Sequence, residues 1–265
     1  MSLRNWVRGS VPWNDLEQVG RELARRSPDE TVRIEFLEAD NWLSTPLVVD
    51  DRWFVKVITP QNALVHALFT TGRNLGVFSS GTEGFFDRFD GPLQMAEHEL
   101  EATRKMRDIG LNAPEPVEAF GVGDLGVLVL EYLPDFRTLD DVEPAAAGTL
   151  ARSLFAVLHE LHAHGLAHGD LRAENVLVVD EEVYFIDATS VRDEGLAGAR
   201  AYDLACALAV LAPMLQAREA VRIAASVYPT ADLLAAREFL DFVKLRPDHD
   251  FDAALVKGEI EKIAN

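Results

Sequence analysis

Cysteine, long apolar runs and an N-terminal signal core are scarce or missing in this chain of 265 residues. The one cysteine, Cys206, excludes a disulfide within the chain, and its place in the apolar run 204–215 predicts a small buried hydrophobe. That run contains Pro213 and is well short of the roughly 20 apolar residues that a membrane span needs. We therefore expect a cytoplasmic protein that does not bind membranes.

Basic residues are also few. The chain has 25 lysines and arginines against 44 aspartates and glutamates, which gives a formal net charge of −19, and only 5 of the basic residues are lysine. Because nucleic acids require a basic surface, we expect no direct nucleic-acid binding. High salt would screen the self-repulsion of this charge, so the composition favours a salt-loving, archaeal source, with an ordinary acidic protein as the alternative.

The pattern of apolar residues divides the chain into a sheet-rich first part and a helical second part. The first part is predicted to contain helices at 13–26 and 95–109, an irregular insertion at 59–94, and strands at 32–36, 47–49, 53–58, 116–120 and 127–130. The second part is predicted to contain helices at 145–164, 199–217, 218–227, 231–243 and 252–263, and a hairpin of 176–179 with 183–186.

This order of elements predicts an α+β fold with two lobes, a small antiparallel β-sheet lobe and a helical lobe, with a cleft between them. We expect an N-terminal helical extension at 1–30, the sheet lobe at 31–133 and the helical lobe at 134–265. Pro134 and Asp135 interrupt the pattern where the two lobes would join.

The strongest functional signal is His-Gly-Asp-Leu-Arg-Ala-Glu-Asn at 168–175, followed by Phe-Ile-Asp at 185–187. Phosphoryl transfer from ATP requires a carboxylate that orients the attacking hydroxyl, together with ligands for metal ions. Asp170 and Asn175 can supply that carboxylate and one metal ligand, and Asp187 can hold a metal from the adjacent hairpin. The alternative is an ordinary polar turn followed by a strand that ends in Asp.

These motifs resemble the protein-kinase signature, in which His-Arg-Asp-Leu is followed by Asn five residues after the Asp. Gly169 stands where those kinases have Arg, and Asp187 lacks the Phe-Gly that usually frames the metal-binding Asp. In both respects the segments 166–171 and 184–191 are similar to the catalytic and metal-binding loops of the RIO family of atypical kinases. The resemblance covers roughly residues 31–215.

The resemblance implies ATP as the phosphate donor and Mg²⁺ or Mn²⁺ as the cofactor. The site residues that it implies are Asp170, His168 and Arg172 in the catalytic loop, Asn175 and Asp187 as metal ligands, and Lys56, Glu99, Glu131, Leu133, Ser44 and Thr45 in the ATP site.

Two of these residues are also selected by the apolar pattern. Lys56 lies in the strand 53–58, which is apolar on both faces, so its charge requires an anionic partner. On the helix 95–109, Glu99 shares the apolar face, whereas Glu97 and Glu101 lie on the other face. We therefore predict that Lys56 pairs with Glu99. A lysine that reaches water and a solvated glutamate are the alternatives.

The chain departs from the kinase pattern in three places. Residues 38–45, where a glycine-rich loop should cover the phosphates, contain no glycine, which leaves Ser44 and Thr45 as candidate phosphate donors. Phe54 replaces the small residue usually found above the adenine. Only fifteen residues separate Asp187 from Asp203, so an activation segment is missing, as in RIO proteins.

Asp203 and a group of histidines have less specific interpretations. Asp203 is expected to open an apolar helix, either as its N-terminal cap or, by the resemblance, as a brace for the catalytic-loop backbone. A zinc site is a further hypothesis, which core packing and catalytic-loop support outweigh. The histidines concerned are His159, His162, His164 and His168.

We expect a RIO-like kinase that phosphorylates serine or threonine on proteins, itself included, or turns over ATP as an ATPase. One alternative is a small-molecule phosphotransferase of the aminoglycoside or choline kinase type, which shares the His-Gly-Asp loop. Another is a weakly catalytic, nucleotide-dependent switch or scaffold, favoured by Phe54 and the missing glycine-rich loop. The phosphate acceptor, a protein or a small molecule, is left open.

Overall fold

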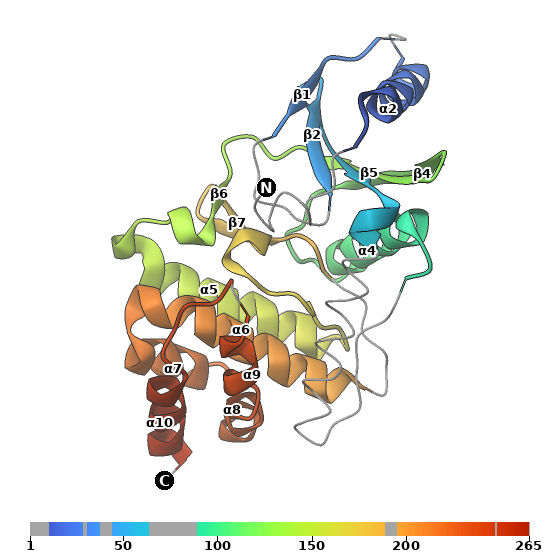
Figure 1. The fold of residues 1–265 in the computed structure, drawn as a ribbon. Coiled ribbons are helices and arrows are strands. Elements are labelled where there is room, and N and C mark those ends of the chain that lie inside the picture. Colours follow the sequence, from blue (N-terminus) through green and yellow to red (C-terminus); the bar gives the residue numbers. More distant parts are fainter. Residues whose placement is uncertain are drawn as a thin grey trace, which may run out of the picture. The chain divides into compact units, whose positions relative to one another are not determined.

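The computed structural model of the chain describes residues 11–28, 31–37, 44–63, 89–188, 195–246 and 248–264. They belong to two compact units (Figure 1). The described part of the N-terminal unit lies before residue 64 and in 89–105 and 114–134, and that of the C-terminal unit lies in 106–113 and 135–264. One unit is built on an antiparallel sheet and the other is mainly helical, which confirms the predicted α+β, kinase-like fold class.

The N-terminal unit contains a five-stranded antiparallel sheet with strand order β1-β2-β3-β5-β4. Its elements are α2 (Trp13–Arg26), β1 (Ile34–Phe36), β2 (Thr45–Val49), β3 (Trp53–Ile58), α4 (Pro92–Asp108), β4 (Pro116–Val122) and β5 (Leu125–Glu131). Helix α2 and β3 have the predicted bounds, and α4 begins three residues before the predicted start. Of the predicted insertion at 59–94, residues 64–88 lie outside the described residues.

The two faces of this sheet pack against different helices. Successive side chains of a strand point to opposite faces. Val57 of β3 lies in a buried cluster with Val19 of α2, whereas Ile58 lies in a second cluster with Ala96 of α4. Lys56, two residues before Ile58, is therefore on the face that α4 covers.

Helix α4 begins unusually close to the sheet. A Cβ atom on Gly126 of β5 would lie 2.2 Å from the backbone oxygen of Pro92, the first residue of α4. Only a residue without a side chain allows this approach. Gly126 thus allows the start of α4 to pack closely on β5. Because Glu99 lies on α4, this packing also affects the position of Glu99.

The C-terminal unit is built around α6, which lies beside α5 (Figure 1). Its elements are β6 (Arg137–Thr138), the 3₁₀ turn Leu139–Asp141, α5 (Pro144–Ala163), the 3₁₀ turn Ala173–Asn175, β7 (Val176–Val179), β8 (Glu182–Phe185), α6 (Leu196–Leu215), α7 (Ala217–Ala225), α8 (Thr230–Arg237), α9 (Leu240–Lys244) and α10 (Ala253–Ala264). Strands β6, β7 and β8 form a small antiparallel sheet in that order. This sheet fixes the loop before β7 and the loop after β8.

Helix α6 is strongly apolar. By length and composition it is the one described helix that could cross a membrane, and 72% of its most apolar window is buried inside the protein. Cys206 lies in its buried part as a free thiol, as predicted, and burial raises the pKa of that thiol to about 12. The thiol is therefore neutral and acts as a small core side chain.

One predicted helix of this unit is wrong. The chain does not form a single helix over 231–243, because the backbone breaks between α8 and α9. There the amides of Glu238 and Phe239 bond to carbonyls three residues back, to Ala235 and Ala236. This tighter hydrogen-bond spacing ends α8 without glycine or proline, so the sequence carries no signal for the break.

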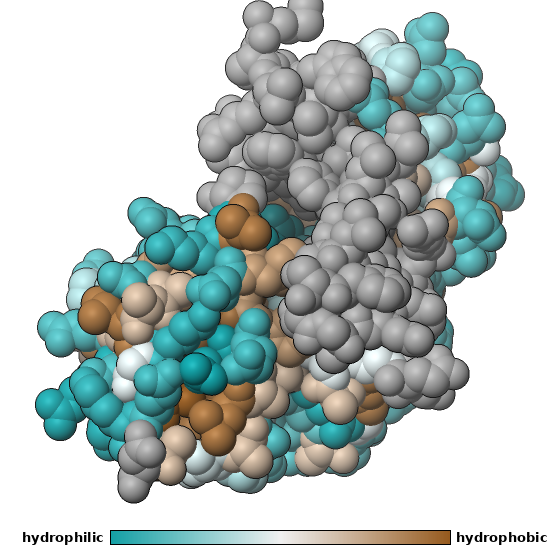
Figure 2. Space-filling view, turned by 60° about the horizontal axis from the view of Figure 1, so that its bottom comes forward, coloured by the Kyte–Doolittle hydropathy of each residue, from teal (hydrophilic) through white to brown (hydrophobic). Residues whose placement is uncertain are grey.

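On the face drawn in Figure 2, hydrophilic residues and apolar patches lie side by side in the coloured part of the surface. Among the exposed apolar side chains of the C-terminal unit, Leu245 is 80% exposed and Leu255 is 61% exposed. Single exposed apolar residues are common on soluble proteins and need no further explanation.

The contact between α4 and β5 gives a test of the fold. Gly126→Ala should lower the free energy of unfolding by about 1–3 kcal/mol, because the added methyl group meets backbone atoms that cannot rotate away. Gly148→Ala in α5 is the control: no atom lies within 4 Å of its added Cβ, so we expect a gain of about 0.5–1 kcal/mol. Urea unfolding of both variants measures this difference. Equal stability of the two variants would contradict the close approach of α4.

Candidate active site

A buried ion pair connects the sheet of the N-terminal unit to α4. Lys56 Nζ donates a hydrogen bond of 2.7 Å to Glu99 Oε1, and the two residues are 3% and 9% exposed. Glu97 and Glu101 are exposed, so the predicted helix register and the predicted pair are both confirmed. Removing one partner would leave an uncompensated buried charge, which is why such a pair holds its geometry firmly.

Ser44 and Thr45 lie where the chain enters β2. Thr45 is opposite Val57 in the sheet. Ser44 is buried, and its Oγ finds no hydrogen-bond partner among the described residues. A buried unpartnered hydroxyl is costly, so Ser44 remains a candidate donor to a phosphate. The rest of the predicted phosphate loop, 38–43, lies outside the described residues.

The predicted adenine segment continues from the end of β5. Glu131 already has structural contacts: its amide donates to the Glu115 carbonyl at 2.9 Å, and its Oε2 accepts the Glu115 amide at 3.0 Å. The Tyr132 amide donates to the Arg52 carbonyl at 2.8 Å, and Leu133 is half-buried. The side chain of Glu131 thus ties the end of β5 to the start of β4, and a role for this segment in binding adenine stays a prediction.

In the C-terminal unit, a single buried carboxylate holds the backbone of the catalytic loop. Asp203 is fully buried and accepts the amide of His168 at 2.6 Å and the amide of Gly169 at 2.8 Å. His162 Nε2 lies 3.3 Å from the same carboxylate. The expectation that Asp203 opens its helix is wrong, because α6 begins at Leu196; the brace implied by the resemblance is what the structure contains.

The loop backbone also explains why residue 169 is glycine. Gly169 has a φ angle of +81°, in the left-handed region that costs other residues roughly 1–2 kcal/mol. The preceding residue, His168, is fully buried and its ring meets Phe185 edge-on at 5.2 Å. Burial lowers the pKa of His168, so the ring is neutral and supports the loop without adding a charge.

Asn175 and Asp187 are brought together by the register of the β7–β8 hairpin. Val176 is opposite Phe185, and the amide of Ile186 donates to the Asn175 carbonyl at 3.1 Å, so Asp187 follows directly beside Asn175. Asp187 has a φ angle of +60°, a strained conformation of the kind found at functional sites.

These two residues suit a hard divalent cation. Asn175 Nδ2 donates to the Asp170 carbonyl at 2.8 Å, which turns the amide oxygen of Asn175 to the other side. An amide oxygen and a carboxylate are the ligand types that Mg²⁺ prefers. No group of three or more histidine, cysteine or acidic side chains in the described residues is arranged as a metal site, so this pair would need water or phosphate oxygens to complete the coordination.

The catalytic-loop carboxylate, Asp170, faces two arginines. Arg246 Nη2 donates to Asp170 Oδ1 at 3.0 Å, and Arg172 Nε lies 3.4 Å from Asp170 Oδ2. Burial alone would lower the pKa of Arg246, but the neighbouring Tyr202 and Asp170 outweigh burial and raise that pKa well above its usual value. Both arginines are therefore charged, and each also pairs with a second carboxylate, Arg246 with Asp248 and Arg172 with Glu174.

Sequence reasoning missed Arg246 and its neighbours. Asp248 Oδ1 accepts Arg246 Nε at 3.0 Å, Asp248 Oδ2 accepts the same Nη2 that donates to Asp170, and Tyr202 Oη accepts Arg246 Nη1 at 2.6 Å. Burial lowers the pKa of His249 to about 4, and the charge of Arg246 acts in the same direction. The only sequence signal is a run of polar residues after α9, which is typical of any loop.

The other histidines have structural contacts. His162 lies between Asp203 and Tyr228, whose hydroxyl is 3.1 Å from His162 Nδ1, and the His159 ring meets the Tyr228 ring edge-on at 5.1 Å. His164 Nδ1 lies 3.0 Å from the Glu160 carbonyl. These side chains support the loop and the helices around α5.

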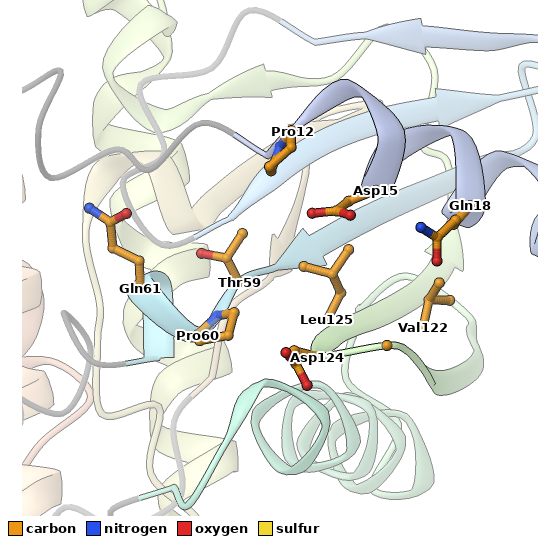
Figure 3. A pocket seen from close by; sticks show the side chains of 10 residues that line it. Pro12, Asp15, Gln18, Thr59, Pro60, Gln61, Val122, Asp124 and Leu125 are labelled. Atoms are coloured by element: carbon orange, nitrogen blue, oxygen red, sulfur yellow. The ribbon is translucent and has the colours of Figure 1, made fainter.

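A pocket of about 440 Å³ in the N-terminal unit is separate from the predicted site residues (Figure 3). Asp15 and Gln18 face it from α2, Asp124 from the β4–β5 turn, and Thr59 from the end of β3 (Figure 3). Its described lining contains two carboxylates and no lysine or arginine, so it does not suit a polyphosphate.

The geometry described above defines a class of protein. A lysine on the third strand that pairs with a helix glutamate, and a loop aspartate followed five residues later by asparagine, are arrangements of protein-kinase-like proteins. Residues 92–194 match the family model of the RIO domain. The match includes Glu99, the catalytic loop and Asp187, so this part of the chain is similar to the RIO domain, in agreement with the resemblance seen in the sequence.

Solved structures with a similar course of the chain include kinases and pseudokinases. The Drosophila melanogaster PAN3 pseudokinase has 15% sequence identity and a TM-score of 0.41, and 85% of this chain covers 63% of that chain. The Cydia pomonella granulovirus kinase PK-1 has 14% identity and a TM-score of 0.46, and 92% of this chain covers 97% of that chain. Similarity at this level is not informative about activity. No curated protein sequence matches the chain.

The Lys56–Glu99 pair can be tested by a double-mutant cycle. Lys56→Met and Glu99→Leu should each cost about 3–5 kcal/mol of unfolding free energy, because each leaves a buried charge without its partner. The double variant should cost far less than the sum of the two. Denaturant unfolding of the four proteins measures the coupling.

The control is the Arg104–Glu101 pair on the same helix, whose side chains are 47% and 48% exposed. Its cycle should give a coupling below about 1 kcal/mol. Equal couplings for the two pairs would contradict the buried charge pair.

Proposed function

We propose that this protein is an ATP- and magnesium-dependent phosphotransferase that phosphorylates serine or threonine on proteins. The observation that carries the proposal is the geometry of the catalytic loop. Asp170 directly follows His168 and Gly169, whose backbone amides both donate to Asp203. Asn175 in the same loop lies beside Asp187. A phosphoryl-transfer enzyme works mainly by positioning and by electrostatic stabilisation, so rigid placement of these groups is the property it needs.

In this proposal the charged groups of the N-terminal unit bind phosphate. Lys56 is fixed by Glu99 and offers its ammonium group to the α- and β-phosphates of ATP, as in kinases generally. Ser44 Oγ is a second donor, supported by its burial without a described partner. These two groups would supply some of the phosphate contacts that a glycine-rich loop supplies in other kinases.

In the C-terminal unit, Asn175 and Asp187 would hold magnesium. Held by these residues, the metal would supply positive charge that stabilises the transferring phosphate. The amide oxygen of Asn175 and the carboxylate of Asp187 fit this role chemically, and the hairpin register keeps them adjacent.

Asp170 would orient the acceptor hydroxyl. The two arginines beside it are balanced by the carboxylates of Glu174 and Asp248, so the charge of this site does not select between cationic and anionic acceptors. The similarity to the RIO domain supports serine or threonine of a protein as the acceptor, and the amino-sugars and choline used by the small-molecule kinases that share the His-Gly-Asp loop are the alternative.

The metal role can be tested without turnover. ATP with magnesium should raise the melting temperature of the parent protein more than ATP with EDTA, because a ligand that binds only the folded state stabilises it. Asp187→Asn, which tolerates the left-handed backbone, should lose most of the magnesium-dependent increase. Asp124→Asn in the exposed β4–β5 turn is the control and should keep it. Equal magnesium-dependent increases in the parent and Asp187→Asn would remove Asp187 from the site.

The catalytic role is tested by phosphate transfer. Asp170→Asn should bind ATP within about three-fold of the parent and transfer phosphate roughly 10²–10⁴ times more slowly, since it loses the orienting carboxylate. The measurement is transfer of labelled γ-phosphate to protein serine and threonine, including this chain, and in parallel to an aminoglycoside and to choline. Transfer to the small cations alone would contradict the proposed acceptor class, and an undiminished rate in Asp170→Asn would contradict the role of Asp170.

A further inference from the structure

Arg246 reaches the catalytic loop from the segment between α9 and α10. It is 76 residues from Asp170 in sequence, yet its Nη2 donates to Asp170 Oδ1 at 3.0 Å. The side chains of Arg246 and Asp170 are only 15% and 14% exposed. A charge-assisted hydrogen bond in such a shielded setting is stronger than one at the surface.

The guanidinium of Arg246 is itself held on two further sides. Asp248 accepts from both Nε and Nη2, and Tyr202 Oη accepts from Nη1 at 2.6 Å. Tyr202 is fully buried and its ring meets that of Phe239 edge-on at 6.1 Å. These contacts with Asp248 and Tyr202 fix the orientation of the guanidinium in addition to its bond with Asp170.

Two adjacent residues of α6 therefore act on the catalytic loop, one directly and one through Arg246. Asp203 holds the loop backbone directly, at the amides of His168 and Gly169. Tyr202 acts through Arg246 on the side chain of Asp170. One rigid element thus sets both the position of the loop and the direction of its carboxylate.

We infer that Arg246 is a positioning residue for phosphotransfer: it fixes the carboxylate of Asp170 in the orientation that receives the acceptor hydroxyl. The inference rests on the proposed function. An ionised carboxylate accepts about four hydrogen bonds, so the bond from Arg246 is compatible with an acceptor hydroxyl on the same group. The competing role is an inhibitory plug, in which Arg246 must leave before the hydroxyl can bind.

The test compares initial rates of labelled phosphate transfer at saturating magnesium and ATP. Arg246→Ala should lower kcat about 10- to 100-fold with the KM for ATP within about three-fold, because misdirection of Asp170 affects the transfer step and not nucleotide binding. Arg246→Lys should recover part of the rate, since lysine keeps the charge but lacks the planar fork. Tyr202→Phe, which removes only the hydroxyl, should give a smaller loss of kcat.

Two controls separate positioning from general stability. Arg237→Ala removes an arginine of the same unit that pairs with Glu238 and Glu261, and it should leave kcat unchanged. In the Asp170→Asn background, Arg246→Ala should cause no further loss, because its effect passes through Asp170. Melting temperatures of all variants show whether each is folded, and Arg246→Lys and Tyr202→Phe provide the result if Arg246→Ala does not fold.

The possible outcomes are distinguishable. A parent protein that transfers no phosphate would overturn the proposed function and this inference with it. An active parent whose Arg246→Ala variant is equally active or faster would overturn the inference alone, the faster rate in favour of the plug. An equal proportional loss in the parent and Asp170→Asn backgrounds would also overturn it.

Discussion

The structure of the catalytic loop depends on one buried carboxylate. Asp203 is fully enclosed in α6, and a carboxylate in such a place costs several kcal/mol unless strong hydrogen bonds compensate it. The amides of His168 and Gly169 supply those bonds at 2.6 and 2.8 Å. Because the cost of releasing Asp203 is high, the loop backbone is fixed, and Asp170 and Asn175 have defined positions as a consequence.

Buried charges that require a partner also fix the geometry at two other places in the molecule. The Lys56–Glu99 pair and the Arg246–Asp170 pair are each shielded from water, so their geometry is enforced by the cost of an unpaired charge. Each pair joins segments far apart in sequence, a strand to a helix in one case and an interhelical segment to a loop in the other. A phosphotransferase that works by positioning its reacting groups gains from this rigidity. The exposed ion pairs on the helices contribute little to the stability of the fold.

The features that were predictable from the sequence depend on the periodicity of apolar residues or on residues that are close together in the chain. Burial of Lys56 followed from a strand that is apolar on both faces, and the inward face of Glu99 followed from helical periodicity. The adjacency of Asn175 and Asp187 followed from the hairpin between them. These inferences needed only local patterns and the chemistry of a buried charge.

The features that were not predictable are those that depend on distant contacts. Asp203 was expected near the start of its helix, because the sequence does not mark Leu196 as the first residue of α6. The break between α8 and α9 carries no glycine or proline. Arg246 lies in an ordinary polar loop, and nothing local indicates that folding brings it to Asp170. The halophilic source and the cytoplasmic location stay predictions.

The most direct test of the account is a crystal structure of the parent protein with magnesium and a non-hydrolysable ATP analogue. The account predicts a metal ion bound by the amide oxygen of Asn175 and the carboxylate of Asp187, phosphate oxygens within hydrogen-bond distance of Lys56, and the Arg246–Asp170 contact intact. A nucleotide bound away from these residues, or a metal that touches neither Asn175 nor Asp187, would contradict it.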